Sequence, residues 1–155
     1  MFLVSDTSLS RESRIQSLLI DEPPLAAILA VIHFEWTIRR AIIALGTSPN
    51  VNVRTKLEAC HGHTKYKQLW REEVYPQINK RLPEVIREWE GLQKSFKLRH
   101  KLVHGVKSCG KSEFTDERVR WALDAAKDVR EFCHFYQVDL DSRLPIRRQL
   151  KEKID

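Results

Sequence analysis

The sequence predicts an all-α protein, an up-and-down bundle of three long helices and one to three short ones. Apolar residues recur at steps of three and four along three long segments, a spacing that places them on one face of a helix. The chain of 155 residues has only 5 glycines and 6 prolines, too few for the turns of a many-stranded β-sandwich. Hydrophobic residues make up 42% and charged residues 31%, which is typical of a helix-rich globule and not of a disordered chain.

The first half of the chain predicts two well-defined helices and one ambiguous region. A short amphipathic helix fits residues 10–20, and it is closed by two prolines that cannot continue it. A longer helix fits 25–45 and ends at Gly46, which we expect in the left-handed conformation that often terminates a helix. Residues 51–75 predict one or two short helices, with a break near Gly62.

The second half predicts two further long helices. The first covers 83–104, because proline suits the first turn of a helix, and Gly105 is expected to cap its end. Residues 107–114 are expected to form a loop. The last helix covers 115–138 and starts with Thr-Asp-Glu, which supplies a capping hydroxyl and acidic groups that the helix dipole favours.

The length of the chain predicts one domain, a single bundle formed by residues 1–138 and followed by a loose basic tail at 139–155. The longest apolar run, 25–32, is too short to span a bilayer, and the first residues lack the basic segment of a signal peptide. No membrane partner is therefore expected. Three cysteines without the spacing of a disulfide framework favour reduced thiols in a cytoplasmic protein. They are Cys60, Cys109 and Cys133.

The positive charge of the chain is concentrated in one stretch. The net charge is +6, and residues 91–112 alone carry six lysines and arginines with no Asp or Glu. Such a concentration indicates a polyanionic partner. A run of charges is also what an ordinary solvated helix face shows, so both interpretations stay open.

Two of the apolar helix faces each contain one charged residue. Glu35 stands at a core position of the 25–45 helix, and Arg99 at a core position of the 83–104 helix. A charge on an apolar face is unfavourable unless it is paired or hydrogen-bonded. Either the two residues form an inter-helix ion pair that only fixes the packing, or this part of the two helices is the wall of a polar cleft.

The spacing of Arg99, His100 and His104 restricts what they can do together. At 100° per residue, Arg99 and His104 lie about 140° apart around a regular helix, whereas His100 and His104 share one face. For Arg99 and His104 to act on one group, His104 must gain freedom at the helix end or meet a second copy across a two-fold axis. The spacing therefore favours a site at the interface of a homodimer.

These residue types suit the chemistry of phosphodiesters. Arginine binds a phosphate bidentately, and histidine can give or take a proton near neutral pH. In RNA, a base can activate the ribose 2′-hydroxyl to attack the adjacent phosphorus while an acid protonates the leaving 5′-oxygen, so no metal is required. The lysines around the pair are expected to bind the RNA backbone. They are Lys94, Lys97, Lys101 and Lys107.

The stretch 99–104, RHKLVH, resembles the Arg-polar-x3-His motif of HEPN domains, a superfamily of helical bundles that includes ribonuclease toxins, abortive-infection proteins and CRISPR effectors. In that family the motif lies near the end of a long core helix, and two motifs meet in a dimer. His100 occupies the middle polar position, where the family often has Asn. Glu35 matches the inner acidic residue that the family carries on an early helix.

The resemblance implies a metal-independent endoribonuclease without a cofactor, with RNA as substrate and a composite site in a homodimer. It implies catalytic roles for Arg99, His104, His100 and Glu35. A toxin or anti-phage defence effector, with an antitoxin or a partner defence protein, is the physiological role implied. Many HEPN domains are instead inactive and bind RNA or proteins, and this is the alternative function.

A metal site is the other chemistry that the histidines suggest. His100 and His104 have the spacing of a helical ligand pair, and neighbouring Cys and His residues could complete a site. The sequence contains no CxxC or HExxH pattern, and the basic residues around His100 would repel a cation. We therefore expect no metal, and we assign no role to the other histidines. These are His33, His61, His63 and His134.

Overall fold

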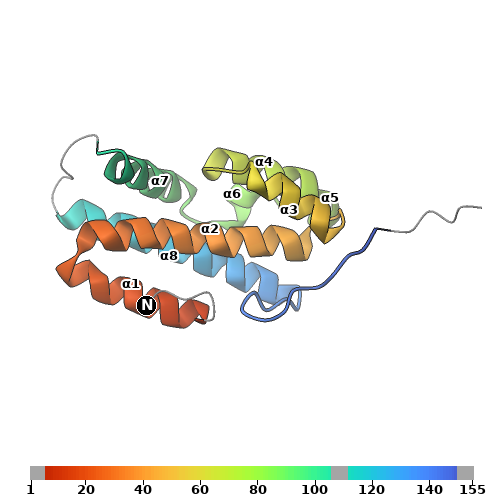
Figure 1. Cartoon of the computed structure of the whole chain (residues 1–155), viewed down its shortest axis with the longest axis horizontal. Helices are drawn as coiled ribbons and strands as arrows, with labels where there is room; N and C mark the ends of the chain where they lie inside the picture. The colour runs from red at the N-terminus through yellow and green to blue at the C-terminus, as the bar shows by residue number, and fades with distance from the viewer. Residues whose placement is uncertain (1–5, 106–111, 150–155) are drawn as a thin grey trace, which may run out of the picture.

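The computed structural model describes residues 6–105 and 112–149, and of residues 112–114 the backbone only. Every secondary-structure element in these ranges is an α-helix, which confirms the predicted all-α bundle. The long helices alternate in direction along the chain, as an up-and-down bundle requires (Figure 1). They are α1 (Ser8–Asp21), α2 (Pro23–Leu45), α7 (Trp89–Val103) and α8 (Ser112–Phe135). The described residues thus hold four of these helices where the sequence predicts three, because α1 is longer than the short helix expected over 10–20.

The short helices lie between α2 and α7 in sequence and cover one end of the bundle (Figure 1). They are α3 (Asn50–Glu58), α4 (His63–Glu73), α5 (Tyr75–Ile78) and α6 (Leu82–Val85). The break expected near Gly62 separates α3 from α4. The described residues thus hold more short helices than the sequence predicts.

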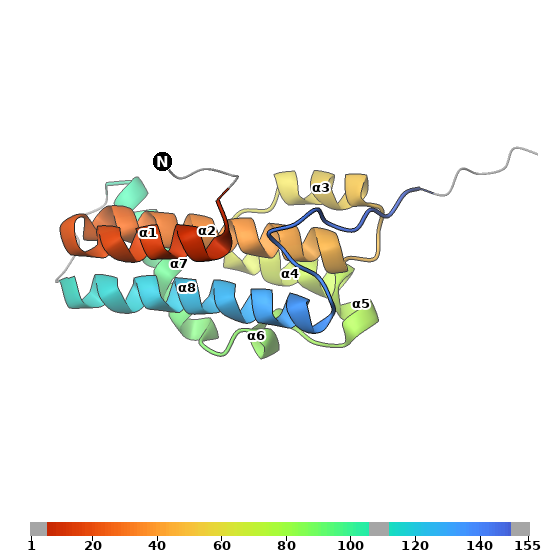
Figure 2. The same cartoon turned by 90° about the horizontal axis from the view of Figure 1, so that it is seen from below.

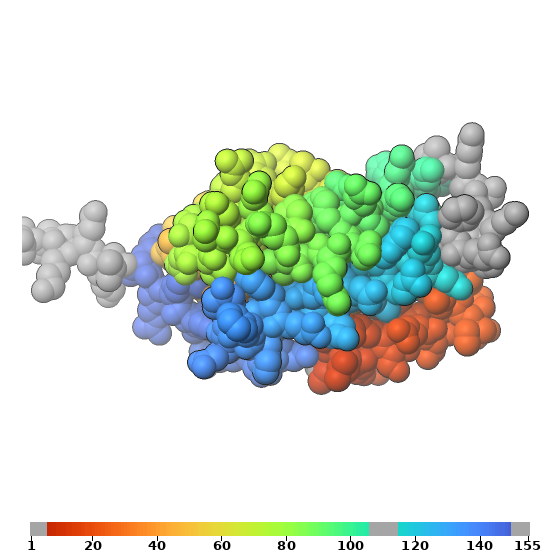
Figure 3. All heavy atoms as spheres, turned by 180° about the vertical axis from the view of Figure 1, so that it is seen from behind, coloured from red at the N-terminus to blue at the C-terminus, as the bar shows by residue number. Residues whose placement is uncertain are grey.

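Helix α2 is the centre of the fold. It packs along α8, which runs beside it in Figure 2, with α1 on one side and α7 and α4 on the other (Figure 1). Fully buried alanines on both α2 and α8, such as Ala30 and Ala126, let the two helices approach closely. From the opposite side of the molecule, α8 runs between α1 and the segment that contains α4 to α7 (Figure 3).

Polar contacts of Glu12 also connect α1 to α2 and α8. The carboxylate of Glu12 on α1 pairs with Arg130 of α8 and lies 3.1 Å from Nε2 of His33, which is buried on α2. Leu9 and Ile20 of the same helix remain exposed, whereas Ile15 is fully buried. Helix α1 is therefore amphipathic, as its sequence predicts.

The helix predicted over 83–104 is interrupted, so this prediction is wrong in its first part. Helix α6 ends at Val85, Ile86 is extended, and α7 begins only at Trp89. Asp128 of α8 explains the break, because its carboxylate accepts the backbone N–H of Arg87 at 3.0 Å and the Arg87 guanidinium at 2.7 Å. Burial of Ile86 fixes the extended residue beside this contact.

The ends of α7 and α8 differ in detail from the predictions. Gly105 has a φ of +64°, so the predicted glycine cap after α7 is confirmed. Helix α8 begins three residues before Thr115 and ends at Phe135, not at 138. Residues 107–111 of the predicted loop lie outside the described residues, while 112–114 are helical.

At Gly91, an added Cβ would lie 2.5 Å from the Trp121 ring, so glycine permits the close contact of α7 with α8.

The segment after α8 is not a loose tail as far as residue 149. Leu140 and Leu144 are buried, and Arg147 donates to the carbonyls of Ile43 and Ala44 at 2.7 and 3.1 Å. Arg147 therefore caps the C-terminus of α2. Gly46, expected to be left-handed, is extended with φ −67° instead, because Arg147 satisfies the carbonyls that a left-handed cap would otherwise serve.

The described cysteines are free and buried. Burial raises the pKa of both thiols, that of Cys133 to about 12, so neither is an activated nucleophile. Cys109 lies outside the described residues. Within 6–105 and 112–149, no helix has the length and apolar character needed to cross a membrane.

Glu73 at the end of α4 allows a test of the fold by pH. Its buried carboxylate accepts the Ser48 hydroxyl at 2.8 Å and the Lys56 ammonium at 2.7 Å, besides the backbone N–H groups of Thr47 and Ser48. Burial opposes ionisation, but the bonds from Lys56 and Ser48 outweigh it and lower the pKa of Glu73 to about 2.

The pKa of Glu73 is lowered in the folded state. The stabilisation that its ionised carboxylate contributes is therefore present above pH 4.5 and is lost as the pH falls toward 2. Glu73→Gln should lower the free energy of unfolding by about 2 kcal/mol at pH 7, measured by urea denaturation. The difference from wild type should shrink as the pH approaches 2. A difference that is independent of pH would contradict the ionised role of Glu73. Exposed Glu72 on the same helix is the matched control, and Glu72→Gln should have little effect.

Candidate active site

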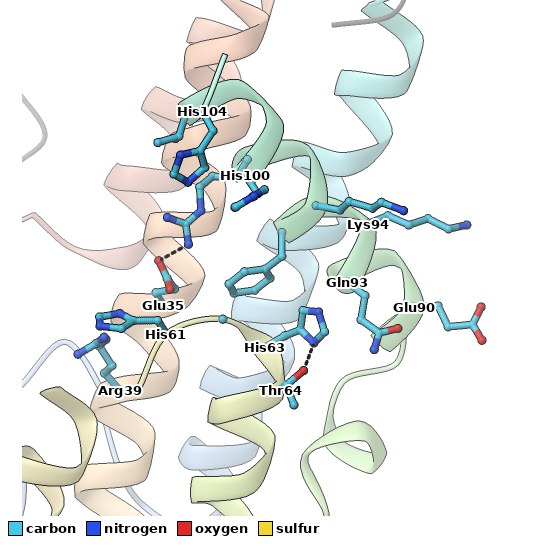
Figure 4. Close-up of a pocket in the computed structure, with 15 residues that line it drawn as sticks. Glu35, Arg39, His61, His63, Thr64, Glu90, Gln93, Lys94, His100 and His104 are labelled. Carbon is cyan, nitrogen blue, oxygen red and sulfur yellow. Dashed lines mark hydrogen bonds and ion pairs between the residues drawn. The ribbon is translucent and has the colours of Figure 1, made fainter. Parts of the chain in front are cut away.

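A groove of about 1010 Å³ runs between the N-terminal end of α4 and the length of α7, with α2 as its floor (Figure 4). Glu35 and Arg39 reach it from α2, and 61–64 reach it from the α3–α4 junction. The remaining lining residues come from α7 and the residue that follows it. They are Glu90, Gln93, Lys94, Phe96, Lys97, Arg99, His100, Val103 and His104.

Glu35 and Arg99 meet in this groove, as the sequence predicts. The guanidinium Nη2 of Arg99 donates to Oε2 of Glu35 at 3.3 Å. The side chains are 16% exposed for Glu35 and 28% exposed for Arg99. The predicted inter-helix contact is confirmed, and the pair also lines a polar groove, as the second interpretation expects.

Tyr66 of α4 holds the second oxygen of the Glu35 carboxylate. Its hydroxyl donates to Oε1 of Glu35 at 3.3 Å and accepts the Arg39 Nε–H at 2.7 Å. The ring is fully buried, and burial together with the charge of Glu35 raises the pKa of Tyr66. Tyr66 therefore stays a neutral hydrogen-bond donor and fixes the carboxylate that in turn fixes Arg99.

Arg39 ties the α3–α4 junction to this network. Its two terminal nitrogens donate to the carbonyls of Leu57 at 3.2 Å and Cys60 at 2.8 Å. The chain then passes through Gly62, whose φ of +82° and ψ of 160° are accessible to glycine and strained for other residues. This turn directs the segment that carries His61 and His63 along the edge of the groove.

His100 and His104 lie at the end of α7 with their ring centroids 4.3 Å apart, so the predicted contact between them is confirmed. The backbone N–H of His104 still bonds the His100 carbonyl at 3.1 Å, but the α-helix itself ends at Val103. Both rings are exposed and line the groove together with Arg99.

Arg99 and His104 line the same groove although an ideal helix separates them by about 140°. His104 lies just beyond the last residue of α7, which is the first of the two possibilities that the sequence leaves open, freedom at the helix end. The second possibility, the homodimer, stays a prediction.

The lysines predicted to bind RNA divide into three groups. Lys94 and Lys97 line the groove, and the Lys94 ammonium lies 5.5 Å from the centroid of the Trp121 ring. Lys101 is exposed on α7 but is not among the lining residues. Lys107 lies outside the described residues.

Sequence reasoning missed several residues of the groove. Arg39 follows Glu35 by four positions on one helix, a spacing that could have identified it. His61 and His63 flank a glycine, yet nothing in their spacing indicates that they face α7. Tyr66 contacts Glu35 across 31 positions, and no local pattern predicts such a contact.

No group of three or more His, Cys, Asp or Glu side chains within the described ranges is arranged to hold a metal ion. Comparison of the chain with models of protein families, with curated proteins and with solved structures gives no match. The resemblance to HEPN domains therefore rests on the motif at 99–104 and its position.

The network around Glu35 predicts coupled stability effects. Glu35→Ala removes the acceptor of both Tyr66 and Arg99 and should lower the free energy of unfolding by about 1–3 kcal/mol. Tyr66→Phe removes one hydroxyl that Glu35 and Arg39 share, and we expect a loss of about 1 kcal/mol.

A double-mutant cycle by urea denaturation measures this coupling. The double variant should lose less stability than the sum of the single losses, with a difference of about 0.5–1.5 kcal/mol, because both changes remove the same hydrogen bond. Strict additivity would show that Tyr66 and Glu35 do not interact in solution.

Proposed function

We propose that the protein is a metal-independent endoribonuclease of the HEPN type, with its active site in the groove along α7. The observation that carries this proposal is the arrangement of Arg99, His100 and His104 on one wall of a basic groove, with Arg99 oriented by Glu35. An oriented guanidinium next to histidines suits the binding and cleavage of a phosphodiester.

In the proposed reaction, Arg99 binds the scissile phosphate, and Lys94 and Lys97 bind neighbouring phosphates. A histidine takes the proton of the ribose 2′-hydroxyl, whose oxygen forms a bond to phosphorus while the bond to the 5′-oxygen breaks. A second histidine protonates that leaving oxygen. The products are a 2′,3′-cyclic phosphate and a 5′-hydroxyl, and no redox partner or metal enters the balance.

The two proton-transferring histidines come, in this proposal, from His104 of two protomers in a homodimer. Val103, which directly precedes His104 within the motif, is a large apolar residue that is 54% exposed. An apolar side chain exposed next to His104 is what an interface through the end of α7 would bury. His100 contacts His104 and is assigned a supporting role.

The physiological role proposed is that of a toxin or anti-phage defence effector acting on RNA in the cytoplasm. The basic groove is exposed in the single chain, so an antitoxin or partner defence protein that covers it would inhibit cleavage. This role rests on the resemblance of residues 99–104 to HEPN domains.

One observation favours the second candidate, an inactive bundle that binds RNA or protein. The charge of Arg99 is already paired with Glu35 at 3.3 Å, which is also what a purely structural arginine shows. A binder would retain RNA affinity without turnover, so measurement of cleavage separates the two candidates.

Wild-type protein should cleave single-stranded RNA in the presence of EDTA and leave DNA of the same sequence intact, because DNA lacks the attacking 2′-hydroxyl. His104→Ala and Arg99→Ala should each lower the cleavage rate at least about 100-fold. His100→Ala should lower it less. Gel analysis of labelled RNA, with identification of the cyclic phosphate by mass spectrometry, provides the measurement.

The control for this experiment is RNA affinity measured on the same variants. His104→Ala should retain most of its affinity, because the lysines of the groove still neutralise phosphates. Loss of cleavage with EDTA would indicate a metal enzyme. RNA binding without cleavage in the wild type would establish the binding module instead.

The dimer is tested by placing a charge at its proposed centre. Val103→Glu should convert the dimer to a monomer in light scattering and abolish cleavage, while the far-UV circular dichroism stays unchanged because the side chain is over half exposed. Val51→Glu is the matched control, since Val51 on α3 is 70% exposed and distant in sequence from the motif. A Val103→Glu monomer that still cleaves RNA would rule out a composite site.

A further inference from the structure

The groove has two halves of different chemistry. The half around Arg99 and His104 carries charged and titratable groups, among them Glu35. The other half, between the start of α4 and the first turns of α7, is formed by His63, Thr64 and Gln93 (Figure 4). The proposed function uses the first half only and leaves the second without a role.

His63 is held as a fixed ring in the second half. It makes edge-to-face contacts with Trp89 and Phe96, with ring centroids 6.1 and 5.5 Å away and interplanar angles of 90° and 75°. Oγ1 of Thr64 lies 3.4 Å from Nδ1 of His63 and adds a polar restraint. Partial burial, and to a lesser extent Lys67, lower the pKa of His63, so the imidazole is neutral at pH 7.

Gln93 places a free amide in the same half. Within the described part of the chain its amide has no hydrogen-bond partner, and Figure 4 shows it directed toward His63 and Thr64. An amide offers a donor beside an acceptor, which matches a hydrogen-bonding edge of a nucleobase; the pairing of glutamine with N6 and N7 of adenine is one example. Glu90 points away from this half of the groove (Figure 4).

The volume of the groove exceeds what a phosphate group requires. At about 1010 Å³ it lies at the upper end of the range of about 300–1,000 Å³ that is usual for small-molecule sites. A strand whose phosphate binds Arg99 would therefore bring an adjacent nucleoside into the half that contains His63.

We propose that His63, Thr64 and Gln93 form a nucleobase subsite that takes one unpaired base next to the phosphate bound at Arg99. The base stacks on the His63 ring, and its hydrogen-bonding edge pairs with the Gln93 amide. This inference rests on the proposed binding of RNA in the groove. It defines the substrate as a strand with at least one base outside a duplex, because a base can stack on the His63 ring only when it is separated from its neighbours in a helix.

A non-cleavable ligand tests the subsite separately from catalysis. The probe is a short, fluorescently labelled 2′-O-methyl RNA, which lacks the free hydroxyl needed for attack, and a series in which each base in turn is replaced by an abasic residue. Fluorescence anisotropy at low salt gives the affinities. For the wild type, one position should show a loss of about tenfold on base removal, the size expected for one base–aromatic stack.

The variants then locate that base in the groove. His63→Ala should lose most of the difference between the intact and the abasic probe, whereas His63→Phe should restore it because it keeps a flat ring. Gln93→Ala should reduce the difference. Lys97→Ala is the matched control, because it removes a phosphate-binding charge of the groove and keeps the ring and the amide, and it should weaken both probes to the same extent. Far-UV circular dichroism confirms that each variant is folded.

The outcomes separate this inference from the proposed function. If the wild type shows no difference between intact and abasic probes at any position, or if His63→Ala keeps the full difference, the subsite is wrong. If the probe binds with the expected difference but unmodified RNA is not cleaved, the subsite stands and the nuclease proposal fails. If the intact probe does not bind at all, both are wrong.

Discussion

The groove depends on one carboxylate that stands where the helix pattern calls for an apolar residue. Glu35 lies on the inner side of α2, and a charge in that position needs partners. Glu35 accepts hydrogen bonds from Tyr66 of α4 and Arg99 of α7, and the Tyr66 hydroxyl accepts one from Arg39. Through Arg39 the same network reaches the carbonyls of the α3–α4 junction. A single charge thus sets the positions of three elements around the hollow.

This network orients Arg99 and leaves most of its hydrogen-bond donors available to a ligand. The contact with Glu35 uses one terminal nitrogen, and the side chain is 28% exposed. Partly exposed ion pairs contribute about 0–1 kcal/mol, so a phosphate that binds the rest of the guanidinium does not have to overcome a strong internal pair. Under the proposed function, Glu35 therefore supplies orientation and the lysines supply most of the electrostatic attraction. Affinity and geometry come from different residues.

The sequence predicted what depends on short-range periodicity and on the pairing of charges. The all-α class follows from the apolar spacing, and the contact of Glu35 with Arg99 follows from the requirement that each of them have a partner. It did not predict features created by residues distant along the chain. Asp128 breaks the 83–104 helix from 41 positions away, and Arg147 caps α2 across more than 100. Each of these residues looks like an ordinary surface charge in its own segment.

Glu73 and Glu35 are both carboxylates that connect several helices, but only Glu35 faces a candidate site. Glu73 accepts four hydrogen bonds, from two backbone N–H groups, one hydroxyl and one ammonium, and these fill the capacity of a carboxylate. Glu35 accepts two from the described side chains and faces a groove. A saturated carboxylate can only hold protein segments together. Glu35 is not saturated, and it pairs with a partly exposed arginine in a groove that two exposed histidines also line. It therefore leaves hydrogen-bonding capacity that a ligand can use, whereas Glu73 at the end of α4 has a structural role only.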